Sequence, residues 1–157
     1  MLGFSLTGVY MKIDEEFDEF LNRVLNMVGV YEEKVCKDIS KGELTLKEIR
    51  IIENVLTLAK EGDVNIGDLA TSIFLSPSAL SIAVSTLCRK GYLKKMKKNG
   101  DQRYSFIVPT DKAKEISKIH RAYHAKLFNY IYNKCNPEDL HAFTTVIKEV
   151  ERSLGGK

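Results

Sequence analysis

The chain has 157 residues, 44% of them apolar and 29% charged, and its formal net charge is +3. This composition predicts one globular domain, or one domain with helical arms, large enough for an apolar core. No window approaches the roughly 18 consecutive apolar residues of a membrane span, so we expect no membrane partner. The apolar residues 1–10 lack a basic segment before them and a cleavage site after them, which favours a cytoplasmic protein. Either Met1 or Met11 could be the start.

A long helix is predicted over residues 13–36, because apolar side chains recur there at spacings of three and four. These side chains are Phe17, Leu21, Val24, Val28, Tyr31 and Val35. We expect Lys41 and Gly42 to break the helix. Thr45 with Glu48 three residues later predicts a capping box, and hence a second helix running to about residue 60.

Two short helices with a tight connection are predicted next. Asn65 can cap the first over residues 66–70, and Ser76 can cap the second, with Pro77 in its first turn. The second helix has an apolar face made of Leu80, Ala83, Val84 and Leu87, and an opposite face of mostly small residues made of Ser78, Ala79, Ser81, Ile82 and Ser85. Gly91 is expected to end this helix. The arrangement is typical of a helix-turn-helix motif.

A basic β-hairpin is predicted immediately afterwards. Residues 92–98 and 103–108 are the expected strands, and Asn99-Gly100 is a strong hairpin-turn signal. From residue 89 to residue 103 seven basic residues accompany one acidic residue, a local charge of +6, although the whole chain carries only +3. A solvated lysine-rich turn could explain such a run in isolation. Beside a helix with a small-residue face, the local charge favours a nucleic-acid-binding surface.

Two further helices are predicted after the hairpin. Pro109 should stop the strand, and Thr110 should cap a helix to about residue 134. Asn136 and Pro137 should begin a last helix that runs to about residue 154. Both helices carry apolar stripes, made of Ile116, Ile119, Tyr123, Leu127 and Tyr130 in the first and of Leu140, Phe143, Val146, Ile147 and Val150 in the second.

The stretch from Leu44 to Thr110 resembles the MarR family of winged helix-turn-helix transcription regulators. The resemblance rests on LTLKEIRII, IGDLA, LSPSALSIAVSTLCRKGYL and DQRYSFIVPT, in that order. It implies a mainly α fold with a β-hairpin wing, and dimerisation helices on both sides of the DNA-binding domain. The implied segments are a tail and dimerisation helix at 1–43, the winged helix-turn-helix domain at 44–109, and C-terminal dimerisation helices at 110–157. The implied activity is repression by a homodimer on a pseudo-palindromic operator, released by an effector.

The expected partner is double-stranded DNA, with recognition helix 76–90 in the major groove and wing 92–108 in the minor groove. The helix lacks an arginine that could contact guanine with two hydrogen bonds, so we expect an A/T-rich operator read partly through its shape. By resemblance, Arg103 enters the minor groove and Asp101 orients it. The candidate DNA-binding residues are Asn65, Ser76, Ser78, Ala79, Ser81, Ile82, Ser85, Arg89, Lys94, Lys95, Lys97, Lys98, Asp101 and Arg103.

The effector is less defined by the sequence. His120 and His124 share one helix face. With Glu32 they resemble in position the zinc-responsive branch of the family, but Arg50 stands where that branch has a histidine. The run KIHRAYHAKL also resembles the branch that represses fatty-acid biosynthesis with an acyl-carrier-protein co-repressor. Three interpretations stay open: histidines in a structural polar network, an acyl-type or other small organic effector bound near Glu32, Arg50, His120 and His124, and a metal, which the arginine disfavours.

No enzyme signature is present: the chain contains no P-loop, GxGxxG, HExxH or GxSxG motif, and we predict no catalytic residue, cofactor or metal site. Cys36, Cys88 and Cys135 are widely spaced and suggest neither a disulfide framework nor a zinc site. The alternative function is a winged-helix protein–protein adaptor that has lost operator binding. Such an adaptor would be expected to lose the wing charge, which this chain keeps together with Asp101 and Arg103.

Overall fold

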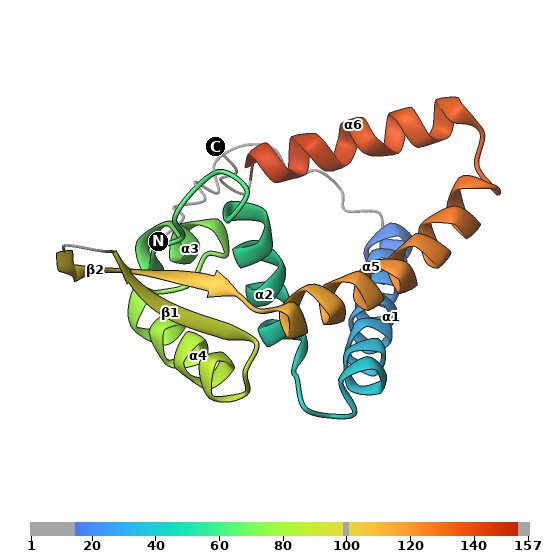
Figure 1. Cartoon of the computed structure of the whole chain (residues 1–157). Helices are drawn as coiled ribbons and strands as arrows, with labels where there is room; N and C mark the ends of the chain where they lie inside the picture. The colour runs from blue at the N-terminus through green and yellow to red at the C-terminus, as the bar shows by residue number, and fades with distance from the viewer. Residues whose placement is uncertain (1–14, 99–100, 154–157) are drawn as a thin grey trace. The chain divides into compact units, whose positions relative to one another are not determined.

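The computed structural model describes residues 15–98 and 101–153, with the side chains of residues 15, 98, 101–104 and 151 excepted. The elements in chain order are α1 (Glu15–Ser40), α2 (Leu46–Leu58), α3 (Ile66–Ser72), α4 (Pro77–Arg89), β1 (Leu93–Lys98), β2 (Asp101–Pro109), α5 (Asp111–Tyr132) and α6 (Pro137–Ser153). Figure 1 shows the hairpin of β1 and β2 beside α4. The mainly helical fold with one β-hairpin is confirmed. The predicted hairpin turn, Asn99-Gly100, and the two candidate starts, Met1 and Met11, lie outside the described residues.

The chain divides into two compact units, residues 1–46 and residues 47–157. In the first, α1 continues one turn beyond the predicted end at residue 36. The helix ends at the predicted pair, Lys41 and Gly42, because both residues have positive φ, 53° and 78°. The hydroxyl of Ser40 donates to the carbonyl of Cys36 and accepts from the amide of Leu44, which closes this helix end.

The core of the second unit is formed by residues from five of its elements. Fully buried side chains come from α2 (Ile49, Ile52, Val55), α3 (Leu69), α4 (Leu80, Val84, Leu87), β1 (Leu93) and α5 (Ala113). Helices α3 and α4 contact each other, α4 contacts β1, and α5 contacts β2. Burial of this apolar surface is the main contribution to the stability of the unit.

The capping residues predicted for four helices are confirmed. The side chain of Asn65 accepts from the amide of Asp68, that of Ser76 from Ala79, and that of Thr110 from Ala113. At α6 the side chain of Asn136 likewise accepts from the amide of Asp139. Local side-chain chemistry therefore sets the starts of α3, α4, α5 and α6.

Two features of the winged core were not predicted. Val64 forms an isolated antiparallel bridge with Ile107, whose amide donates to the Val64 carbonyl at 2.8 Å. Phe74, in the connection between α3 and α4, has φ 54° and a side chain 78% exposed. A bulky residue in the left-handed region is unusual, and a side-chain pattern gives no sign of it.

Among the described residues no single helix is long and apolar enough to cross a membrane. Helices α3 and α4 taken together meet that test of length and composition, but their axes are bent by 106°.

Candidate nucleic-acid interface

Helix α4 has one buried and one exposed face, as predicted. Leu80, Val84 and Leu87 are fully buried and fix the orientation of the helix on the core. On the other side Ser78, Ala79 and Ser85 are exposed, Ser81 is half-buried, and Ile82 is 72% exposed. An isoleucine so exposed, among side chains this small, leaves a surface that a second macromolecule can approach closely.

The end of α4 is held by a glycine turn of the Schellman type. Gly91 has φ 81°, its amide donates to the carbonyl of Cys88, and the amide of Tyr92 donates to that of Leu87. The hydroxyl of Thr110 then donates to the carbonyls of Gly91 and Tyr92 at 2.8 and 3.0 Å. The end of α4, the start of the hairpin and the start of α5 are thus joined through one short segment.

An ion pair also joins α4 to α2. The ammonium group of Lys90 lies 2.6 Å from a carboxylate oxygen of Glu48, and both side chains are largely shielded from solvent. Lys112 donates to the Lys90 carbonyl at 3.1 Å, and its ammonium group lies 4.1 Å from the centre of the Tyr92 ring. Because Glu48 and Lys90 lie 42 residues apart, no local pattern could have revealed this contact.

Several candidate DNA-binding side chains already have partners within the chain. The amide group of Asn65 caps α3 through its oxygen and donates to the carboxylate of Asp68 through its nitrogen. The hydroxyl of Ser85 donates to the carbonyl of Ser81 and accepts from Lys95 at 3.3 Å. Ser76 caps its own helix. The bonds of Ser76 and Ser85 position the exposed face of α4, and those of Asn65 hold the start of α3.

The hairpin carries its cations on exposed positions. Lys94, Lys95 and Lys97 of β1 are exposed, as is Arg89 at the end of α4. The strands pair in antiparallel register from Leu93 opposite Pro109 to Lys97 opposite Ser105, and the register shifts between Lys97 and Lys98. The backbone positions of Lys98, Asp101 and Arg103 lie in the two strands, whereas their side chains lie outside the described set.

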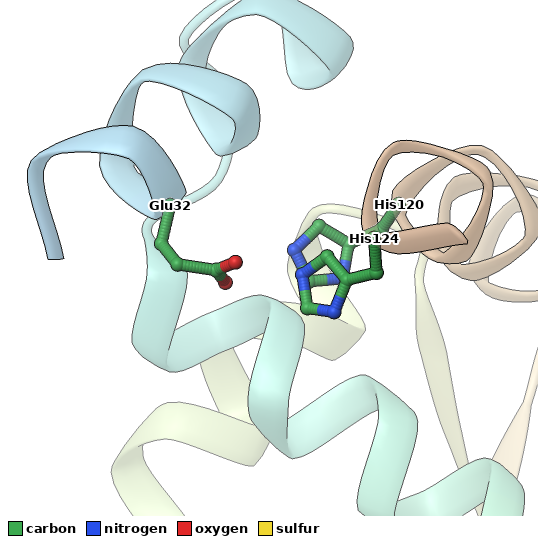
Figure 2. A group of neighbouring side chains, drawn as sticks. All are labelled: Glu32, His120 and His124. Carbon is green, nitrogen blue, oxygen red and sulfur yellow. The ribbon is translucent and has the colours of Figure 1, made fainter. Parts of the chain in front are cut away.

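The two candidate effector histidines lie together on α5. The rings of His120 and His124 are 4.4 Å apart, and Figure 2 shows them on successive turns. His120 is 2% exposed, and its Nδ1 lies 3.1 Å from a carboxylate oxygen of Glu53 on α2. Arg50 is exposed on α2, and Glu32, also drawn in Figure 2, belongs to α1 in the other unit. No pattern in the sequence indicates Glu53, which lies 67 residues from His120.

The carboxyl group of Glu53 is held in its charged form by this cluster. Burial alone raises its pKa, but the hydrogen bond and charge of His120, with the charges of Arg121 and His124, lower the pKa below the ordinary 4.5. At neutral pH Glu53 is therefore a carboxylate, and the cluster is a hydrogen-bonded polar network between α2 and α5.

The three cysteines are free thiols: Cys36 is buried, Cys88 half-buried and Cys135 exposed. Burial raises the pKa of the Cys88 thiol, and nearby Lys95 opposes this effect in part. A thiol with a raised pKa is protonated at neutral pH and so a weak nucleophile.

Comparisons with known proteins agree with this geometry. A MarR family model matches residues 44–104. The regulator TcaR of Staphylococcus aureus is 25% identical over 139 residues, covering 87% of this chain and 89% of that protein. The HTH-type transcriptional regulator YvnA of Bacillus subtilis is 26% identical over 110 residues, 68% of each chain.

Solved structures show the same fold. FabT of Streptococcus pneumoniae, in complex with DNA, has a TM-score of 0.79 at 20% identity, over 89% of this chain and 96% of that one. AbsC of Streptomyces coelicolor, a MarR family regulator, has a TM-score of 0.75 at 20% identity, over 96% of this chain and 100% of that one. The family match over residues 44–104, the curated relatives and the winged core together make this chain similar to the DNA-binding transcription regulators of the MarR family.

Proposed function

We propose that the chain is a homodimeric repressor that binds a pseudo-palindromic, A/T-rich operator, with α4 in the major groove and the hairpin in the minor groove. The observation that carries this proposal is the exposed face of α4 beside exposed Lys94, Lys95 and Lys97. A helix fits the major groove, and residues in its N-terminal half reach base edges. A regulator of this kind acts in the cytoplasm, where its DNA lies.

Base reading is assigned to the first two turns of α4. Ser78 and Ser81 can hydrogen-bond to several base edges, and Ala79 and Ile82 can contact thymine methyl groups. The hairpin lysines contact phosphates and contribute affinity without sequence preference. Arg103, at the far end of the hairpin, is assigned to the minor groove, whose negative potential is deepest in narrow A/T tracts.

The homodimer is proposed from apolar faces that the single chain leaves exposed. Helix α1 exposes Phe17, Phe20, Leu25, Met27, Val28 and Val30, and α6 exposes Phe143, Val146, Ile147 and Val150. Isolated exposed apolar residues are ordinary, but whole helix faces of them mark interaction surfaces. A second copy of the chain is the proposed occupant, since a pseudo-palindromic operator requires two recognition helices related by a two-fold axis.

Release from the operator is assigned to an effector that is a small organic molecule or an acyl-type ligand. The hydrogen bond between His120 and Glu53 supports a structural role for the histidines, because it uses one ring nitrogen inside the protein. A metal effector is disfavoured because one of the four candidate effector-binding residues, Arg50, is itself a cation.

The proposal is tested by fluorescence anisotropy with DNA from upstream of the gene that encodes the chain. Six to ten phosphate contacts predict that affinity falls about a thousandfold or more between low and moderate salt. Arg103→Ala should weaken binding at least about tenfold, which corresponds to one lost charge-assisted contact. Salt-insensitive binding that Arg103→Ala does not change would favour the adaptor instead.

The dimer is tested separately by sedimentation equilibrium. Phe143→Glu places a charge on the exposed apolar face of α6, and it should shift the chain from dimer to monomer and weaken operator binding. A wild-type chain that sediments as a monomer at micromolar concentration would contradict the homodimer.

A further inference from the structure

A second candidate ligand site lies between α2 and α5, outside the DNA-contacting surface and next to the histidine cluster, which it adjoins through Glu53. Its cavity has a volume of about 320 Å³ and is lined by Leu56, Lys60, Lys114, Ser117, Lys118 and Arg121. We call these six residues the cationic groove. Figure 1 shows α2 beside the first turns of α5, and both belong to the second unit. Sites for small ligands start at about 300 Å³.

Positive charge predominates around the groove. Four of its six residues are cations, and two carboxylates lie close by: Asp111 is 2.8 Å from Lys114, and Glu53 is 4.0 Å from Arg121. Four cations less two carboxylates leave a local charge of +2. Within the part of the chain that the structure describes, neither Lys60 nor Lys118 has an ion-pair partner.

The remaining surface suits a small organic anion. The half-buried side chain of Leu56 and the methylene stems of the lysines supply apolar contacts. The hydroxyl of Ser117, 3% exposed, donates to Glu53 at 3.4 Å, so the polar contacts to a ligand come from the cations. A guanidinium group and three ammonium groups around one cavity match the clustered oxygens of phosphate groups.

The groove faces away from the recognition helix. On α5, Lys112 contacts the end of α4 through the Lys90 carbonyl. Lys114 and Arg121 follow it by two and nine residues, and at about 100° per residue both lie on the opposite side of α5. This position, and the concave shape, favour a small ligand over the DNA duplex.

From this geometry we propose that the cationic groove binds a small organic polyanion that carries phosphate groups. The ligand would contact one side of α5, while Thr110 at the start of the same helix holds the end of α4 through the Gly91 carbonyl. Binding should therefore lower operator affinity, and this regulatory consequence rests on the proposed function, whereas binding itself does not.

Inorganic pyrophosphate is the probe, titrated by calorimetry into the full chain without DNA at constant ionic strength. The variant Lys60→Glu/Lys118→Glu replaces two attractions with repulsions, and it should weaken pyrophosphate binding by about tenfold or more. Lys126→Glu is the matched control, since it reverses an exposed cation of α5 outside the groove and should leave the affinity unchanged. Circular dichroism checks that each variant is folded.

The outcomes separate this proposal from the proposed function. No heat of binding, or equal weakening in the control variant, would overturn the groove. Weaker operator binding by the double variant without pyrophosphate would show that the groove contacts DNA phosphates, which also overturns it. If the chain binds pyrophosphate but no operator, the groove proposal is supported and the proposed regulatory function is contradicted. Pyrophosphate should weaken operator binding in the wild type and in Lys126→Glu, and not in the double variant.

Discussion

Gly91 is the residue on which the end of the recognition helix depends, and Gly91→Ala should destabilise the protein. Its φ of 81° lies in the left-handed region, which destabilises the folded state by about 1–2 kcal/mol for an L-residue with a Cβ. A Cβ at this position would meet no heavy atom within 4 Å, so no steric clash adds to that cost. Alanine also lowers the conformational entropy of the unfolded chain, and this offsets the destabilisation by about 0.4–1 kcal/mol. The net loss of unfolding free energy should be about 1 kcal/mol.

Urea unfolding followed by circular dichroism measures this loss at one fixed protein concentration, because a dimer's stability depends on concentration. With a slope of about 1–3 kcal/mol per molar urea, the midpoint should fall by about 0.5 M at unchanged slope. Gly91→Asn is the matched control, since asparagine tolerates the left-handed region better and should lose less. An alanine variant as stable as the wild type would refute the reasoning that a positive φ at Gly91 holds this turn.

Two other substitutions and one double-mutant cycle test single features of the fold by the same urea assay. Phe74→Asn should raise the unfolding free energy by about 0.5–1 kcal/mol, because it relieves the strain of φ 54° and removes an exposed ring; a loss of stability would mean that the ring has a packing role. Glu53→Gln should cost about 1–2 kcal/mol at neutral pH. Since the folded-state pKa of Glu53 is lowered, its contribution is present above pH 4.5 and lost as pH falls through the folded pKa, so the gap between wild type and variant should close in acid; a gap independent of pH would refute this. A double-mutant cycle on Glu48 and Lys90 should give a coupling of about 1 kcal/mol, consistent with a partly shielded pair at 2.6 Å; zero coupling would show that the pair contributes nothing.

Local patterns in the sequence were sufficient to predict most of the fold. Asn65, Ser76 and Thr110 cap the helices that their side-chain chemistry predicted, and Gly91 ends α4. These features depend on residues within one helical turn of each other. The two faces of α4 were predictable for the same reason, since helical periodicity alone separates Leu80 from Ile82.

Contacts between distant segments were not predictable. The bridge from Val64 to Ile107 and the hydrogen bond from Glu53 to His120 join residues that no periodic pattern relates. The cationic groove was only partly predictable from the sequence. Lys114, Lys118 and Arg121 recur at spacings of four and three on α5, a stripe visible in the sequence, but only the fold brings Lys60 of the α2–α3 connection to it.

The central claim, that the exposed face of α4 reads DNA, is tested most directly by one substitution at Ile82. Ile82→Glu puts a negative charge at the middle of that face, so operator affinity measured by fluorescence anisotropy should fall at least about a hundredfold. Lys126→Glu, which changes the net charge by twice as much but lies away from that face on α5, should bind nearly as the wild type does. Equal affinities for wild type and Ile82→Glu would contradict the account.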